Sequence, residues 1–174
     1  MPSPLFNDFA LMSIPQYSII IPVYNRPQEI EDLLRSLISQ RVKDFEVIIV
    51  EDGSTIRCDQ VVDRYRDKLN IQYFFKPNSG PGPSRNFGFS HAKGKYFIVF
   101  DSDCIIPSDF LKEVEKSLDT NHWDAWGGPD KAHENFTLLQ RAMGYTMSSL
   151  LTTGGIRGGK QRVGWFQPRS FNMG

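Results

Sequence analysis

Apolar residues along the chain follow two alternating patterns, which predict β-strands and α-helices in turn. Short, nearly continuous apolar runs are typical of strands in a parallel sheet, whose two faces are both covered. Four such runs lie at residues 17–24, 45–50, 71–76 and 95–100. Between the first two runs, apolar residues recur every three or four positions, as on the buried face of a helix. This helix is expected within residues 25–40, with Pro27 in its first turn.

Helical spacing returns further along the chain. It predicts a helix over residues 61–69 and another from Ser108 to about Thr120. Residues 78–94 are rich in Gly and Pro and are interpreted as a loop that runs into a short helix. Beyond residue 121 the pattern is less regular, and the main prediction is a longer helix over residues 134–151. Because strands and helices alternate, the predicted fold class is α/β with a doubly wound, mostly parallel sheet.

Polar motifs directly follow three of the predicted strands. They are PVYNR at residues 22–26, EDGST at residues 51–55 and DSD at residues 101–103. In doubly wound sheets, ligands bind beyond the carboxyl ends of the strands. The three motifs are therefore expected at one edge of the sheet, in a common site.

Composition and charge narrow the class of protein. The chain has 174 residues, of which 40% are hydrophobic and 23% charged, as in a globular domain with a sizeable core. Residues 1–16 are interpreted as an N-terminal extension and residues 17–174 as the domain. A formal net charge of zero gives no general attraction to nucleic acid, which is therefore not an expected partner. Two cysteines and the lack of a recognisable signal peptide predict a cytoplasmic protein.

Asp101 and Asp103 are the strongest candidates for chemistry, since two carboxylates rarely follow a buried strand without a partner for their charge. A shared Mg²⁺ or Mn²⁺ ion would suit them, because both ions prefer oxygen ligands. The alternative is that Asp-Ser-Asp is turn chemistry that ends the strand. The position of the pair, on an edge shared with two other polar motifs, favours the cation.

Two further motifs are weaker signals by themselves. Glu51 and Asp52 are placed to accept hydrogen bonds from a base or a ribose, but Asp-Gly is also a common turn, and both interpretations stay open. Arg85 lies in GPGPSRNFG, whose backbone amides and guanidinium suit a phosphate. This segment is neither a P-loop nor a dinucleotide fingerprint.

Taken together, four segments resemble the family 2 glycosyltransferases of the GT-A fold. They are residues 18–26 (SIIIPVYNR), 45–55 (FEVIIVEDGST), 78–104 (NSGPGPSRNFGFSHAKGKYFIVFDSDC) and 172–174 (NMG). The resemblance implies a Rossmann-like GT-A domain that binds a nucleotide sugar, usually UDP-linked. It further implies transfer of the sugar, with inversion, to a glycan, lipid-linked or other acceptor in cell-surface polysaccharide or glycoconjugate synthesis.

The resemblance also implies a role for each matching residue. The residues expected to contact the nucleotide sugar are Pro22, Tyr24, Asn25, Glu51, Asp52, Arg85, Asp101 and Ser102. Pro22 and Tyr24 would frame the base, and Asp52 would contact uracil or ribose. Asp101 would contact the ribose and help to orient a Mn²⁺ or Mg²⁺ ion, with Asp103 as the direct ligand.

The family's catalytic base has no match in this chain. That base lies in an acidic pair downstream of the NMG-like segment, so it is expected beyond Gly174, and the chain is expected to be an incomplete, inactive donor-binding portion. The same missing C-terminal region would supply any association with the cytoplasmic face of a membrane. Two alternatives stay open. One is a nucleotide-sugar-binding module without catalysis, and the other is a haloacid-dehalogenase-like phosphatase, which expects Thr or Val where this chain has Ile105.

Overall fold

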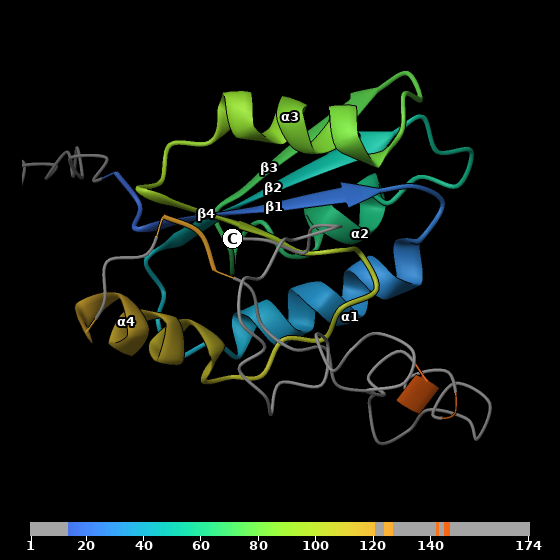
Figure 1. Ribbon diagram of the computed structural model, residues 1–174. Helices are drawn as coiled ribbons and strands as arrows, with labels where there is room; N and C mark the ends of the chain where they lie inside the picture. The colour runs from blue at the N-terminus through green and yellow to red at the C-terminus, as the bar shows by residue number, and fades with distance from the viewer. Residues whose placement is uncertain (1–13, 121–123, 127–141, 143–144, 147–174) are drawn as a thin grey trace, which may run out of the picture. The chain divides into compact units, whose positions relative to one another are not determined.

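The structure is a computed structural model that describes residues 14–120, 124–126, 142 and 145–146. Strands and helices alternate along it, as predicted (Figure 1). The elements are β1 (Tyr17–Val23), α1 (Pro27–Ile38), β2 (Phe45–Asp52), α2 (Asp59–Asp63), β3 (Ile71–Lys76), α3 (Pro81–His91), β4 (Tyr96–Val99) and α4 (Phe110–Thr120). All of them lie in one compact unit, whereas the described residues 124–126, 142 and 145–146 belong to a second unit. The predicted helix over residues 134–151 and the predicted domain boundaries fall largely outside the described residues and stay predictions.

The four strands form one parallel sheet in the order β3-β2-β1-β4. In this sheet Tyr17 pairs with both Phe45 and Tyr96, and Asp52 pairs with Lys76. Helix α3 covers one face, whereas α1 and α2 lie on the other (Figure 1). The predicted α/β class with a doubly wound, parallel sheet is therefore confirmed. The chain reverses its direction of strand addition at β1, so the topological switch point lies between β1 and β4.

Close packing of α3 against the sheet depends on a glycine. Both β1 and β2 are buried along their whole length, as their continuous apolar runs predict. A Cβ atom added to Gly88 would lie 2.5 Å from Cγ2 of Ile20, which is itself fully buried. Only a residue without a side chain lets the helix come this near, so Gly88 sets how closely the C-terminal half of α3 packs on the sheet.

Pro22 is tolerated inside β1 because β4 is short. Proline cannot donate to a sheet ladder and is usually excluded from central strands. The carbonyl of Ile20 accepts a hydrogen bond from the amide of Phe100. Every second residue of a strand directs its backbone polar groups to the same neighbour, so the nitrogen of Pro22 also faces β4. Pairing of β1 with β4 ends at Ile20, and the missing N–H of Pro22 therefore falls beyond the last rung.

The element boundaries differ from those predicted most clearly at three places. Strand β2 continues through Glu51 and Asp52, which were expected in the following turn. Helix α3 begins at Pro81, inside the segment interpreted as a loop, because proline suits the first position of a helix. Helix α2 ends at Asp63, and the chain continues to residue 69 through tight turns in which amides bond three or four residues back. The apolar face predicted for residues 61–69 is still buried, at Tyr65 and Leu69 among others.

Among the described residues, no helix combines the length and the apolar character needed to cross a membrane.

Candidate functional site

Four loops leave the carboxyl ends of the strands, and all three predicted motifs belong to this edge of the sheet. They are the β1–α1 loop (residues 24–26), the β2–α2 loop (residues 53–58), the β3–α3 loop (residues 77–80) and the β4–α4 loop (residues 100–109). The β1–α1 and β4–α4 loops flank the switch point, where ligands bind in sheets of this topology.

Asn25 locks the β1–α1 loop to the β2–α2 loop. Its Oδ1 accepts hydrogen bonds from the amides of Thr55 and Ile56, at 2.8 and 2.9 Å, and from the Thr55 hydroxyl at 3.1 Å. Its own amide donates to Ser54 Oγ at 2.9 Å. The backbone is left-handed here, with φ of 54°, a conformation that asparagine tolerates better than most residues. The Asn25 side chain, which was predicted to contact the nucleotide sugar, thus makes these contacts to the protein.

Asp52 ties the end of β2 to the start of α3. Its Oδ1 accepts from the Ser79 amide at 2.9 Å and forms an ion pair with Lys76, while Oδ2 accepts from the Gly80 amide at 2.7 Å. Burial would by itself raise the pKa of Asp52, but the hydrogen bonds from Lys76, Ser79 and Gly80 outweigh it and hold that pKa below its ordinary value. The carboxylate is 4% exposed and stays ionised at neutral pH.

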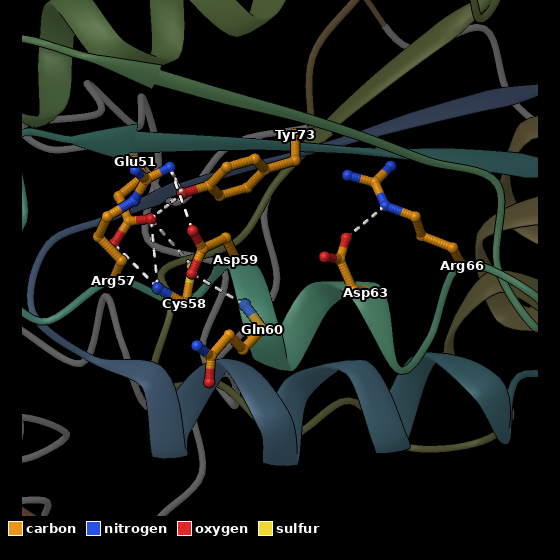
Figure 2. A network of polar contacts seen from close by, with 8 residues as sticks. All are labelled: Glu51, Arg57, Cys58, Asp59, Gln60, Asp63, Arg66 and Tyr73. Atoms are coloured by element: carbon orange, nitrogen blue, oxygen red, sulfur yellow. Dashed lines mark hydrogen bonds and ion pairs between the residues drawn. The ribbon is translucent and has the colours of Figure 1, made fainter.

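Glu51 points into a different environment, shown in Figure 2. Its carboxylate is fully buried and accepts from the Cys58 amide at 3.1 and 3.2 Å and from the Tyr73 hydroxyl. The Cys58 thiol also donates to it, at 3.5 Å. Burial, together with the charge of Glu51, raises the pKa of Cys58 and of Tyr73, so both groups stay protonated and keep donating. Arg57 completes the cluster by bonding Tyr73 and pairing with Asp59.

The two acids of the DSD motif each face an arginine from another element. Arg85, on α3, lies 2.7 Å from Oδ1 of Asp101, and Arg26, in the β1–α1 loop, lies 2.6 Å from Oδ2 of Asp103. The side chains of Asp101 and Asp103 are 41% and 54% exposed, so solvent and ligands reach both. Ser102 between them is buried.

The donor set fits a hard divalent cation with few protein ligands. Within the described part of the chain, no group of three or more His, Cys, Asp or Glu residues is arranged to enclose a metal ion. Mg²⁺ sites of the kind that bind phosphates use one or two carboxylates and complete their coordination with phosphate oxygens and water. Asp101 and Asp103 offer carboxylates of this kind at an exposed turn. Their residue types and their exposure therefore suit Mg²⁺ or Mn²⁺.

The remaining predicted residues lie on the same edge. Pro22 is buried at the end of β1, and Tyr24 beside it is 50% exposed. Nε of Arg85 is buried without a hydrogen-bond partner among the described residues, although the Arg85 side chain as a whole is 24% exposed. Sequence reasoning missed Arg26 and Lys76 as partners of the acids. The signal for Lys76 was its position at the end of β3, directly opposite Asp52 in the register.

Comparison with known proteins gives this arrangement a family. A model described as "Glycosyl transferase family 2" matches residues 18–171. The poly(ribitol-phosphate) β-N-acetylglucosaminyltransferase TarS of Staphylococcus aureus is 38% identical over 113 residues, which are 63% of this chain and 20% of TarS. Crystal structures of TarS residues 1–349 with UDP and with UDP-GlcNAc superpose with a TM-score of 0.65 at 34% and 35% identity, covering 71% of this chain and 38% and 36% of theirs.

The fold is shared more widely than the sequence. The mannosyltransferase PcManGT of Pyrobaculum calidifontis, solved with GDP-Man and Mn²⁺, has a TM-score of 0.62 at 24% identity, over 69% of this chain and 37% of that one. The chain spans well under half the length of TarS, so only a part of such an enzyme is represented in the match. The phosphatase alternative gains no support from these relationships. The match over most of the sequence and the GT-A-like sheet agree: this chain belongs to glycosyl transferase family 2.

Proposed function

We propose that this chain is the donor-binding part of an inverting glycosyltransferase that uses a UDP-linked sugar. The observation that carries the proposal is the gathering of Asp101, Asp103, Arg85 and Arg26 at the switch point of the sheet. Its support is the family match together with the TarS crystal structures, which were determined in complex with UDP and with UDP-GlcNAc. The acceptor is a glycan or a lipid-linked molecule, and the setting is cell-surface polysaccharide or glycoconjugate synthesis at the cytoplasmic side.

Within the site, each residue has a role that follows from its environment. Tyr24 presents an exposed ring at the end of β1 for the base to pack on, beside the buried Pro22. Asp52 holds the β3–α3 loop in place beside the base and the ribose. The partly exposed guanidinium of Arg85 and its paired Asp101 meet the diphosphate and the ribose.

Two residues predicted as ligand contacts are better understood as positioning residues. Glu51 is fully buried, and its carboxylate accepts hydrogen bonds from Cys58 and Tyr73. It therefore holds the β2–α2 loop beneath the site. Asn25 holds the β1–α1 loop against the same segment. Removing either would move Tyr24 and Arg26 without removing a direct contact to the nucleotide.

Asp103, with Asp101 beside it, would hold Mn²⁺ or Mg²⁺. When bound, such an ion supplies a Lewis acid that offsets the negative charge developing on the departing diphosphate. The protein side of this role is the presentation of exposed carboxylates on a turn that is closed by a hydrogen bond from the Cys104 amide to the Asp101 carbonyl. No described residue is assigned as the base that deprotonates the acceptor.

Calorimetric titration of the chain with UDP, with and without Mn²⁺, tests the proposal. We expect UDP to bind and Mn²⁺ to tighten the binding. Asp103→Asn should remove the Mn²⁺-dependent gain without weakening the metal-free binding, because the carboxylate is the metal ligand and Arg26, released from its ion pair with Asp103, can still meet the diphosphate. Asp63→Asn is the matched control, since Asp63 also pairs with an arginine, at 2.7 Å and 65% exposed, but on α2. Absence of UDP binding under both conditions, or an undiminished Mn²⁺ effect in Asp103→Asn, would overturn the proposal.

A further inference from the structure

The ion pair between Arg26 and Asp103 joins the two loops that flank the switch point. Arg26 precedes the first turn of α1, and Asp103 lies in the β4–α4 loop, 77 positions away. Their side chains are 46% and 54% exposed, so neither charge is fixed by burial. The pair is therefore formed across the place where a ligand of this fold binds.

The backbone of Arg26 is held, although its side chain is exposed. The Arg26 carbonyl accepts from the amide of Ile30 at 3.1 Å, as the start of α1 requires. Asn25, one residue earlier, is anchored by its hydrogen bonds to the β2–α2 loop. The guanidinium can thus change partner by rotating its side chain while its Cα stays in place, which keeps it within reach of the same site.

A divalent cation that approaches Asp103 meets a positive charge already paired with that carboxylate. The two acids of the DSD motif are each paired with a guanidinium group, Asp101 with that of Arg85 and Asp103 with that of Arg26. These four side chains together carry no excess negative charge. A cation alone must displace Arg26 and leave its charge without a partner nearby. A diphosphate that arrives with the cation supplies new oxygens for the guanidinium, which binds phosphate well.

We propose that Arg26 is an exchangeable counter-ion that makes the cation and the nucleoside diphosphate bind cooperatively. In the free chain it occupies Asp103 and weakens binding of a cation alone. When both ligands are present it transfers to the diphosphate, so the charge that opposed the cation now favours the nucleotide. This inference rests on the proposed function, and it assigns Arg26 a positioning and coupling role that is reciprocal, as linkage requires.

Binding of Mn²⁺, followed by the electron paramagnetic resonance signal of the free ion, separates the two ligands. It is measured on the whole chain with no nucleotide and at saturating UDP, for the wild type, Arg26→Gln, Arg26→Lys and Arg41→Gln. Arg41 is the matched control, because it also pairs with an aspartate at 2.6 Å, its side chain is 62% exposed, and its removal changes the net charge equally. Circular dichroism and thermal melting confirm that each variant is folded.

We expect Arg26→Gln to bind Mn²⁺ alone about three- to tenfold more tightly, since exposed ion pairs and a nearby like charge have effects of this size. The factor by which UDP tightens Mn²⁺ binding should fall by at least the same ratio. Arg26→Lys should stay close to the wild type, and Arg41→Gln should change neither value by more than about twofold.

Two failures are distinguishable. If the wild type binds no UDP in the presence of Mn²⁺, the proposed function is overturned, and this inference with it. If the wild type binds both ligands but Arg26→Gln behaves as Arg41→Gln does, or binds Mn²⁺ alone more weakly, the exchange role of Arg26 is wrong and the proposed function stands.

Discussion

Substitution of Asp52 by asparagine isolates the contribution of one carboxylate to the edge of the sheet that carries the site. The change keeps the shape of the side chain but replaces one acceptor oxygen by an NH₂ donor. In the wild type, three donors converge on this carboxylate, from Lys76, Ser79 and Gly80. One of the three must therefore face another donor in Asp52→Asn, and Lys76, whose side chain is 14% exposed, loses its ion pair.

The expected cost follows from these losses. Hydrogen bonds to charged groups contribute about 1.5–3 kcal/mol each, and breaking a buried ion pair costs about 3–5 kcal/mol. Lys76 keeps hydrogen bonds to Ser79 and to the Pro77 carbonyl, which reduces the penalty. We expect Asp52→Asn to lower the free energy of unfolding by about 3 kcal/mol, which corresponds to a melting temperature lower by about 6–12 °C for a chain of this size.

The dependence on pH gives a second test of the same reasoning. The pKa of Asp52 in the folded chain lies below its ordinary value of 3.8, so its stabilising contribution is complete above that value. It is lost as the pH falls through the lower, folded pKa. Urea unfolding followed by far-ultraviolet circular dichroism should give a constant difference between wild type and Asp52→Asn from pH 7 to about pH 5, and a shrinking one in more acidic solution.

Asp63→Asn provides the control for the change in charge. Asp63 forms an ion pair whose two side chains are 65% and 45% exposed, and such pairs contribute about 1 kcal/mol or less. A loss for Asp52→Asn no larger than that of Asp63→Asn would refute the idea that this carboxylate organises the β3–α3 loop. So would a difference that widens as the pH falls.

Two other substitutions test how the site is positioned, and melting temperature measures both. Gly88→Ala should destabilise the chain by about 1 kcal/mol, because the overlap with Ile20 at 2.5 Å outweighs the better helix propensity of alanine, whereas Gly82→Ala, with open space around it on the same helix, should not destabilise. A stabilised Gly88→Ala would contradict the packing described for α3. Asn25→Ala should cost about 2–3 kcal/mol through three lost hydrogen bonds and a left-handed backbone that alanine disfavours, while Asn25→Asp, which keeps the acceptor, should lose less. Equal losses in these two variants would show that the bonds from Thr55 and Ile56 contribute little.

The alternation of elements was predictable from the sequence because its cause is local. Continuous apolar runs and helical spacing reflect which faces are buried. As expected, β1 and β2 are buried along their length and α1 buries its apolar face. The start of α3 was not predictable in the same way. Its Gly and Pro residues are typical of loops, and their helical role depends on a first-turn position and on the contact of Gly88 with β1, which involves residues far apart in sequence.

The environments of Glu51 and Asp52 differ in a way that the sequence did not predict. Neighbouring residues of a strand point to opposite faces, so two adjacent acids cannot share one ligand while the strand continues. The predicted strand stopped at residue 50, and the pair was treated as part of a turn. Because β2 in fact runs to Asp52, Glu51 meets Cys58 on one face and Asp52 meets the start of α3 on the other. The pairing of Asp103 with Arg26 depends on loop geometry, which the local pattern does not contain.

The bonds from Thr55 and Ile56 to Asn25 couple the β1–α1 loop to the β2–α2 loop. Any opening of the first loop must either carry the second along or break two amide hydrogen bonds to a single side chain. The amide protons of Thr55 and Ile56 are therefore natural reporters of loop opening in hydrogen-exchange experiments, even though neither residue needs to touch a ligand.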